Sequence, residues 1–160
     1  MIGRRYLSLV PLLLGGYIYA QAGAHCQVVP KSLAAMRGCY RPLLVFSPSP
    51  RDPRLKRQTA LLDAAADDMM DRFVLFTPIA PDERRVSTPL DAPYTVLGSR
   101  ELSELRNRFK IPQGEFAVLL LDENGAVRLR SGTPVSVGRL NALIDRTPRR
   151  KAEMLRRDAN

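Results

Sequence analysis

Three short runs of apolar residues stand out along the chain. They cover residues 42–46, 73–77 and 116–121 and contain almost no polar side chain. Because each run is apolar on both sides of an extended chain, each predicts a strand buried on both faces of a sheet. The segment 127–130 instead alternates apolar residues with arginines, which predicts an antiparallel strand with one face in water. Pro78 is expected to end the second strand.

Helical patterns lie between and after these strands. Asp52 is a good N-cap and Pro53 a good first helical residue, and apolar side chains at helical spacing continue from there to Met69. Ser99 is expected to cap a second helix, and residues 137–144 form the apolar stripe of a third. The sequence therefore predicts three longer helices.

Residues 79–98 show no regular pattern. They contain three prolines and a charged cluster at 82–85. About twenty residues without an element is long for a compact domain, so the segment is either a functional loop or a mobile insertion. We favour the insertion. Upstream, a few apolar residues between positions 30 and 38 predict a single helical turn.

The order of the elements predicts the fold class. It reads strand, helix, strand, helix, strand, strand, helix, and Asn124-Gly125 is a strong hairpin signal between the last two strands. A right-handed crossover makes the first two strands parallel, and the hairpin adds an antiparallel pair. Helices must cover both faces of this sheet, because the strands are apolar on both sides. We expect an α/β, thioredoxin-like domain with a mixed sheet over residues 40–146, preceded by an N-terminal extension over residues 25–39.

The first 24 residues have the three parts of a secretory signal peptide. Arg4 and Arg5 are followed by an apolar run over residues 7–20 and by small residues at 22–24. The run is shorter than the roughly 20 residues that span a bilayer, which favours a cleaved signal over a retained anchor. We therefore expect a periplasmic or secreted protein.

The chain is basic, with 25 Lys and Arg against 16 Asp and Glu. Cleavage of the leader removes two basic residues and leaves a charge of +7, of which residues 146–160 supply +4. The basic C-terminal tail, residues 147–160, suits an anionic surface or an acidic protein partner in the envelope or outside the cell. A solvated terminal helix is the simpler interpretation. Nucleic acid is an unlikely partner for an exported chain without aromatic residues beside its basic ones.

Cys26 and Cys39 are the only cysteines. An oxidising compartment favours a disulfide between them, which would contribute about 3 kcal/mol by restricting the unfolded chain. Two unrelated thiols are the alternative.

The end of the chain resembles a known family. Residues 144–154, Ile-Asp-Arg-Thr-Pro-Arg-Arg-Lys-Ala-Glu-Met, are similar to the Ile-Asp-x-Met-Pro-Met-Arg-Arg-x-Glu-Met string of the bacterial domain-of-unknown-function family 4174, also called P-DUDES. Thr147, Arg149 and Lys151 depart from that string. The resemblance covers residues 40–155 and implies a thioredoxin-like fold, an exported location and relatives among animal extracellular matrix proteins. It implies no settled activity. The matching positions are Ile144, Asp145, Pro148, Arg150, Glu153 and Met154.

The residues that a thioredoxin uses for chemistry are missing. A thioredoxin has Cys-x-x-Cys just after its first strand, at a helix start where the dipole lowers the pKa of a thiol. The equivalent residues here are 51–54, and both cysteine positions read as arginine. Cys39 precedes the first strand, which separates it by roughly 17 Å from the sheet edge where such sites lie. The only histidine, His25, lies at the expected mature terminus, so we predict no catalytic residue, cofactor or metal site.

Two groups of basic residues remain as candidate anion-binding or partner-binding sites. One lies beside the predicted helix N-terminus after Asp52, a location that favours anions, and the other lies in the tail. In both places a solvated surface is the simpler interpretation. The candidates are Arg51, Arg54 and Arg57 in the first group and Arg149, Arg150 and Lys151 in the second.

These observations rank three classes of function. A non-catalytic binding module on a degenerate thioredoxin-like scaffold comes first. An oxidoreductase of thioredoxin or peroxiredoxin type is second, because it would need a reactive thiol near residues 51–55 and none is present. Binding of a polyanion or membrane surface through the tail is third, and it would depend steeply on salt.

Overall fold

Four strands form one mixed sheet in the order β2-β1-β3-β4. β1 pairs in parallel with β2 and antiparallel with β3, and β3 pairs antiparallel with β4. The computed structural model describes residues 26–159, so the expected leader over residues 1–24 and His25 lie outside the described residues. The strands are β1 (Arg41–Phe46), β2 (Val74–Ile79), β3 (Ala117–Leu121) and β4 (Val127–Ser131).

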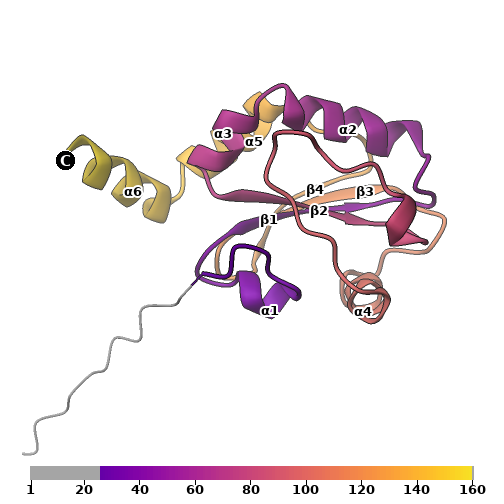
Figure 1. The fold of residues 1–160 in the computed structure, drawn as a ribbon. Helices are drawn as coiled ribbons and strands as arrows, with labels where there is room; N and C mark the ends of the chain where they lie inside the picture. Colours follow the sequence, from indigo (N-terminus) through magenta and orange to yellow (C-terminus); the bar gives the residue numbers. More distant parts are fainter. Residues whose placement is uncertain (1–25, 160) are drawn as a thin grey trace, which may run out of the picture.

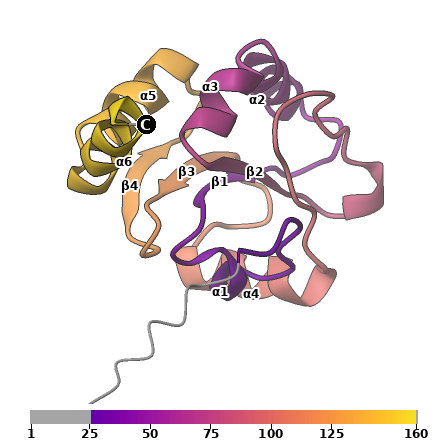
Figure 2. The same ribbon diagram turned by 60° about the vertical axis from the view of Figure 1, so that its left-hand side comes forward.

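Helices cover both faces of the sheet, as predicted (Figure 1). α2, α3 and α5 lie on one face, and α1 and α4 lie on the other, in both views (Figures 1 and 2). α6 continues past α5 at the amino end of β1. The helices are α1 (Leu33–Met36), α2 (Pro53–Asp63), α3 (Ala66–Asp71), α4 (Ser99–Phe109), α5 (Val137–Asp145) and α6 (Pro148–Asp158), with a 3₁₀ turn η1 (Glu83–Arg85).

Two hydrophobic cores fill the space between the sheet and the helices. Leu43 and Val45 point into the core beneath α2, α3 and α5, whereas Leu44 and Phe46 point into the core beneath α1 and α4. Alternate residues of a strand face opposite sides of a sheet, so a strand that is apolar at every position supplies both cores. This confirms the prediction of a thioredoxin-like α/β fold.

β2 runs two residues further than predicted and includes Pro78. Proline is tolerated because β2 is an edge strand and the missing N–H would face outward. Phe76, two residues earlier, donates its N–H outward to Pro93 O at 2.9 Å and accepts from Thr95 N–H at 2.9 Å. The proline therefore removes no hydrogen bond from the pairing with β1.

The predicted helix from Pro53 to Met69 is divided into two. Ala65 leaves the helical conformation, with φ −137° and ψ 40°, and separates α2 from α3. Just before the break, the Asp63 carboxylate accepts the N–H groups of Leu90, Asp91 and Ala92 at 3.0–3.1 Å. The end of α2 is thereby tied to the segment that follows β2.

Residues 79–98 are not a mobile insertion, which corrects the prediction. The segment is bonded to the edge of β2 through Phe76, and Thr95 Oγ1 donates to Pro30 O at 2.7 Å. Val86, Ala92 and Leu97 are buried. These contacts hold the segment against the domain although it has little regular structure.

The two terminal segments are also packed onto the domain. The predicted helical turn within residues 30–38 is present as α1, and it buries Leu33 and Met36 in the core. The tail forms α6 and is held by ion pairs described below. Among residues 26–159, no helix has both the length and the apolar composition that a bilayer crossing requires.

Candidate functional site

The carboxyl ends of β1 and β2 meet at one edge of the sheet, which we call the carboxyl edge. It consists of residues 47–54 after β1, residues 80–82 after β2, Arg106 of α4, and residues 113–116 before β3. Open α/β sheets bind ligands at this edge, because loops and helix N-termini converge there. Residues 51–54, which are equivalent to the Cys-x-x-Cys of a thioredoxin, also lie at this edge.

The start of α2 is stabilised by an internal ion pair. Asp52 accepts the Arg54 backbone N–H at 2.8 Å, and its carboxylate also accepts Arg54 Nε at 3.0 Å and Nη2 at 2.7 Å. These bonds from Arg54 lower the pKa of Asp52 below its usual value, although burial opposes the shift. The Arg54 guanidinium also lies over the Phe116 ring, 4.8 Å from its centre. Arg54 is therefore positioned by its neighbours and remains half exposed.

The other two predicted arginines of this group lie on the surface. Arg51 and Arg57 are exposed, and neither side chain has a hydrogen bond or ion pair with another described residue. The structure thus brings Arg51 and Arg54 to the carboxyl edge and places Arg57 one helical turn further along α2.

Arg106 is a buried cation at the carboxyl edge that the sequence analysis missed. Its side chain donates to Ser47 O at 2.6 Å, Ile79 O at 3.1 Å and Pro112 O at 2.9 Å. The residue is 8% exposed and has no carboxylate partner among residues 26–159. Burial lowers the pKa of Arg106 below its usual value, because nothing negative offsets the loss of hydration.

A helical pattern could have revealed this arginine. Arg106 is four residues after Leu102, and both side chains lie on the buried face of α4. An arginine on an apolar stripe either extends to water or needs acceptors inside the protein. Here the carbonyl groups that follow β1 and β2 are those acceptors.

A small cavity of about 210 Å³ opens beside Arg106. It lies between α4 and the residues after β2, and Ser99, Ser103, Gln113 and Asp82 contribute polar groups to its wall. The cavity is therefore lined by hydrogen-bonding side chains and by one buried cation.

The opposite, amino edge of the sheet carries the disulfide. Cys26 and Cys39 are bonded with an S–S distance of 2.03 Å, which confirms the predicted pairing. Cys39 lies two residues before β1, and Tyr40 Oη donates to Gln27 O at 2.7 Å inside the same loop. The disulfide attaches the first described residues to the start of β1, one strand length away from the carboxyl edge.

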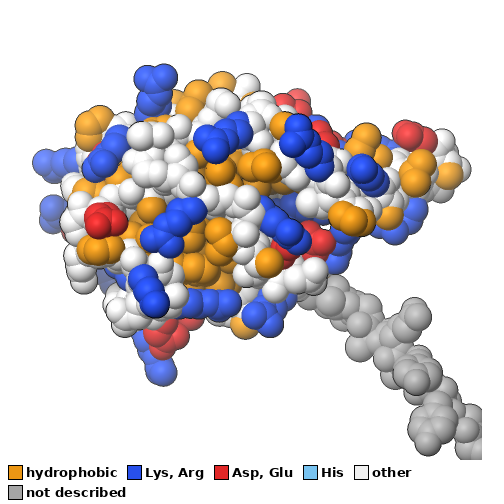
Figure 3. Space-filling view, turned by 180° about the vertical axis from the view of Figure 1, so that it is seen from behind, with side chains coloured by type: hydrophobic (Ala, Val, Ile, Leu, Met, Phe, Trp, Pro, Cys, Tyr) orange, Lys and Arg blue, Asp and Glu red, His pale blue; other side chains and the backbone are white. Residues whose placement is uncertain are grey.

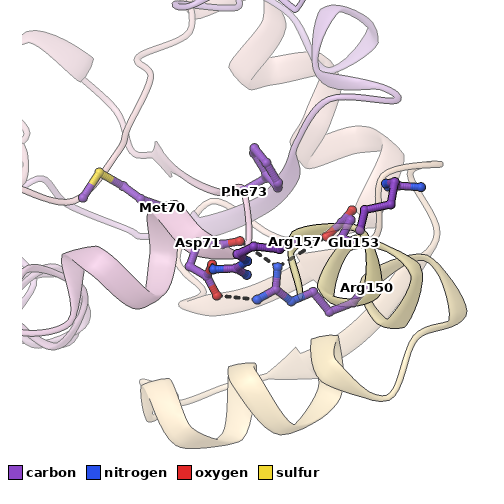
Figure 4. Close-up of a pocket in the computed structure, with 7 residues that line it drawn as sticks. Met70, Asp71, Phe73, Arg150, Glu153 and Arg157 are labelled. Atoms are coloured by element: carbon purple, nitrogen blue, oxygen red, sulfur yellow. Dashed lines mark hydrogen bonds and ion pairs between the residues drawn. The ribbon is translucent and has the colours of Figure 1, made fainter. Parts of the chain in front are cut away.

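The tail arginines have unequal environments, which the sequence did not predict. Arg150 is buried, pairs with Asp71, and lies 3.6 Å from Glu153 (Figure 4). It also pairs with Asp145. Arg149 is partly exposed, with Nε 3.4 Å from Glu153. Lys151 is exposed. Arg150 is thus not available to an external anion, because carboxylates of the chain already surround it.

The carboxylates of this network are shared with the sheet. Glu153 accepts Arg41 Nη2 at 3.0 Å, and Arg41 is the first residue of β1. Burial raises the pKa of Glu153, but the bond and charge of Arg41 and the charges of Arg150 and Arg149 lower it below its usual value overall. A hollow of about 390 Å³ beside Arg150 is also lined by Met70, Phe73 and Arg157 (Figure 4). The network fastens α6 to the amino edge.

The remaining basic residues are dispersed. On the face opposite to that of Figure 1, Lys and Arg side chains surround an apolar area and do not gather in one patch (Figure 3). No group of three or more His, Cys, Asp or Glu side chains within residues 26–159 is arranged to hold a metal ion.

Solved structures similar to this chain share its fold. Thioredoxin peroxidase I of Plasmodium yoelii is 20% identical, with a TM-score of 0.55 over 71% of this chain and 75% of its own. The reduced 2-Cys peroxiredoxin of Plasmodium vivax is also 20% identical, with a TM-score of 0.53 over 71% of this chain and 80% of its own. At this level of identity the likeness concerns the fold.

No curated protein matches the chain in sequence. A family does match, over residues 32–153, which is most of the described chain and includes both the carboxyl edge and the network around Arg150. The resemblance noted in the sequence is thus confirmed: the chain belongs to the family described as domain of unknown function (DUF4174).

Proposed function

We propose that this protein is an exported, non-catalytic binding module that uses the carboxyl edge of a thioredoxin-like scaffold. The observation that carries the proposal is the start of α2. Where a thioredoxin has its thiol pair, this chain has Arg51 and Arg54, and Arg54 is bonded to Asp52. An arginine at this place can hold an anion or a polar partner, but it cannot form a disulfide or transfer electrons.

The position of the two cysteines supports the same proposal. They are bonded to each other at the amino edge, away from the start of α2, the position at which a thioredoxin stabilises its thiolate. A disulfide that closes a short loop restricts the unfolded chain, which is a structural role. A structural disulfide also suits an oxidising compartment and hence the expected export.

The composition of the carboxyl edge favours binding of a polar or anionic group. It presents Arg51 at the surface, Arg54 over Phe116, and Arg106 beside a cavity. The tail is a weaker candidate for a polyanion-binding surface, because Arg150 is buried and Arg149 is paired with Glu153.

The test is turnover of a disulfide and of a peroxide by the purified mature protein. Insulin reduction and peroxide consumption are each measured with wild type and with Cys26→Ser/Cys39→Ser. We expect background rates in both proteins. Turnover above background that disappears in the double variant would contradict the proposal and identify an oxidoreductase.

Export is tested separately by intact mass. Protein recovered from the envelope or the medium of the producing cells is expected to lack residues 1–24. A species that still begins at Met1 and is held in the membrane would contradict the export part of the proposal.

A further inference from the structure

The cavity beside Arg106 has features of an anion-binding site that neither the fold nor the family assigns. It lies at the carboxyl edge, between the residues that follow β2 and the α4 side chains of Ser99, Leu102, Ser103 and Arg106. We propose that it binds a small oxyanionic group, a carboxylate or a phosphate, between Arg106 and the first turn of α4. This proposal rests on the proposed binding function and names the ligand class of the same edge.

Arg106 brings to the cavity wall a positive charge that contacts carbonyl groups and the Phe46 ring, 5.6 Å from its centre, but has no carboxylate partner in the described chain. The residue is more than nine-tenths buried, and its three bonds to backbone carbonyls use only three of its five N–H groups. Its Nε–H has no acceptor among residues 26–159. A buried charge without a counter-charge is unfavourable, so an oxyanion in contact with this guanidinium would regain lost solvation energy.

The first turn of α4 lies at the other end of the same wall. Ser99 is the first residue of the helix and lines the cavity, together with Ser103 and Arg106 on the same face. Gly98 is the N-cap and has no side chain that could accept the free N–H groups of this turn. These N–H groups and the positive end of the helix dipole favour an anion.

The carbonyl bonds of Arg106 explain why the charge is held in place. They join the ends of β1 and β2 to the segment before β3, and so they fix the position of the guanidinium of a residue that lines the cavity. Asp82 is the acidic residue of the wall, and it pairs with Arg85 at 2.8 Å. A volume of about 210 Å³ is smaller than the cavities of drug-sized ligands and suits a single small group.

Nuclear magnetic resonance titration of the mature protein tests the proposal. Sodium phosphate and sodium acetate are added in separate series, with sodium chloride adjusted to keep the ionic strength constant. We expect saturable shifts of the Arg106 Nε–H signal and of the amides of Ser99, Glu101 and Leu102 with at least one of the two anions. Saturation by phosphate alone or by acetate alone supports the proposal and identifies which oxyanion the site prefers.

A single substitution can block anion binding at the site while the fold is kept. Arg106→Lys would break three carbonyl bonds, so loss of binding there would not separate a folding defect from a binding defect. Gly98→Asp is better: a Cβ at Gly98 meets no atom within 4 Å, and the backbone φ is −71°. The new carboxylate would cap α4 and compete with the added anion. We expect at least tenfold weaker binding.

The matched control is Ser136→Asp at the N-cap of α5. Ser136 already accepts the Arg139 N–H, so this variant adds the same charge to a helix N-terminus that is already capped. Binding within twofold of wild type is expected.

The proposal is overturned if neither anion gives saturable shifts at the α4 site, if the shifts spread over exposed arginines such as Arg51, or if Gly98→Asp binds as wild type does. Turnover of a disulfide or peroxide would contradict the proposed function but would not affect the evidence for anion binding at this site.

Discussion

The buried arginines at the two edges of the sheet have different partners. At the amino edge, Arg41 and Arg150 are each surrounded by carboxylates of the chain, with Glu153 shared between them. At the carboxyl edge, Arg106 has no carboxylate partner within the described chain and contacts three backbone carbonyls and the face of the Phe46 ring. The amino edge is electrostatically closed and holds the structure together. The carboxyl edge keeps a charge that an external group could neutralise, so the difference separates a stabilising network from the binding site proposed above.

Loss of Arg150 should give the largest effect. Arg150→Ala leaves the carboxylates of Asp71 and Asp145 without their buried partner, and we expect it to lower the free energy of unfolding by about 4 kcal/mol. Arg157→Ala is the matched control, because Arg157 also pairs with Asp71 but is 59% exposed. It should cost less than about 1 kcal/mol. Urea denaturation measures the free energy of unfolding of both variants. Equal losses would show that the buried network does not stabilise the fold more than an exposed ion pair does.

Removal of the disulfide comes next. Cys26→Ser/Cys39→Ser should lower the free energy of unfolding by about 3 kcal/mol, because the bond closes a loop of 13 residues in the unfolded chain. The same variant should keep the far-ultraviolet circular dichroism of the native fold. A loss of the fold would show that this edge depends on the disulfide more than on the ion pairs.

Acid should weaken the amino edge. Burial raises the pKa of Asp71, but bonds and charges from Arg157 and Arg150 lower it overall, and the pKa of Glu153 is also lowered. The folded protein therefore binds fewer protons than the unfolded chain. This stability is fully present above the usual values of 3.8 and 4.5 and is lost as pH falls through the lower folded pKa values.

Denaturation at pH 7, 5 and 3.5 measures this effect. Wild type should change little between pH 7 and 5 and should lose stability between pH 5 and 3.5. Arg150→Ala should have the shallower dependence, because its carboxylates lack the partner that lowers their pKa. A steeper dependence in that variant would contradict the assignment of Arg150 as their partner.

Substitutions at helix N-caps should change the free energy of unfolding least. They compare the N-terminus of α4, which has no side-chain cap, with that of α5, which has one. Gly98→Asp should raise the free energy of unfolding by about 0.5 kcal/mol, because it caps α4 and brings a negative charge near its N-terminus. Ser136→Ala, at the capped α5, should lower it by about 1 kcal/mol. A destabilised Gly98→Asp would mean that a negative charge is not tolerated beside this cavity.

The local parts of the structure could be predicted from the sequence, and the long-range pairs could not. The strands followed from runs that are apolar on both faces, and the start of α2 followed from Asp52 and Pro53. Arg150 looked like part of a solvated tail, because its partner Asp71 lies 79 residues away and no local spacing reveals that contact. Arg106 was missed for a similar reason, since its acceptors are carbonyls at the ends of two strands.

The most direct test of the two-edge account is the stabilisation that phosphate gives to three proteins. Thermal unfolding is measured with and without phosphate, at constant ionic strength, for wild type, Gly98→Asp and Cys26→Ser/Cys39→Ser. A ligand at ten times its Kd adds about 1.4 kcal/mol to stability. The account predicts equal stabilisation of wild type and of the cysteine variant, and no more than about 0.4 kcal/mol for Gly98→Asp, whose binding is expected to be at least tenfold weaker. Stabilisation of Gly98→Asp equal to that of wild type, or a loss of stabilisation with the disulfide, would contradict the account.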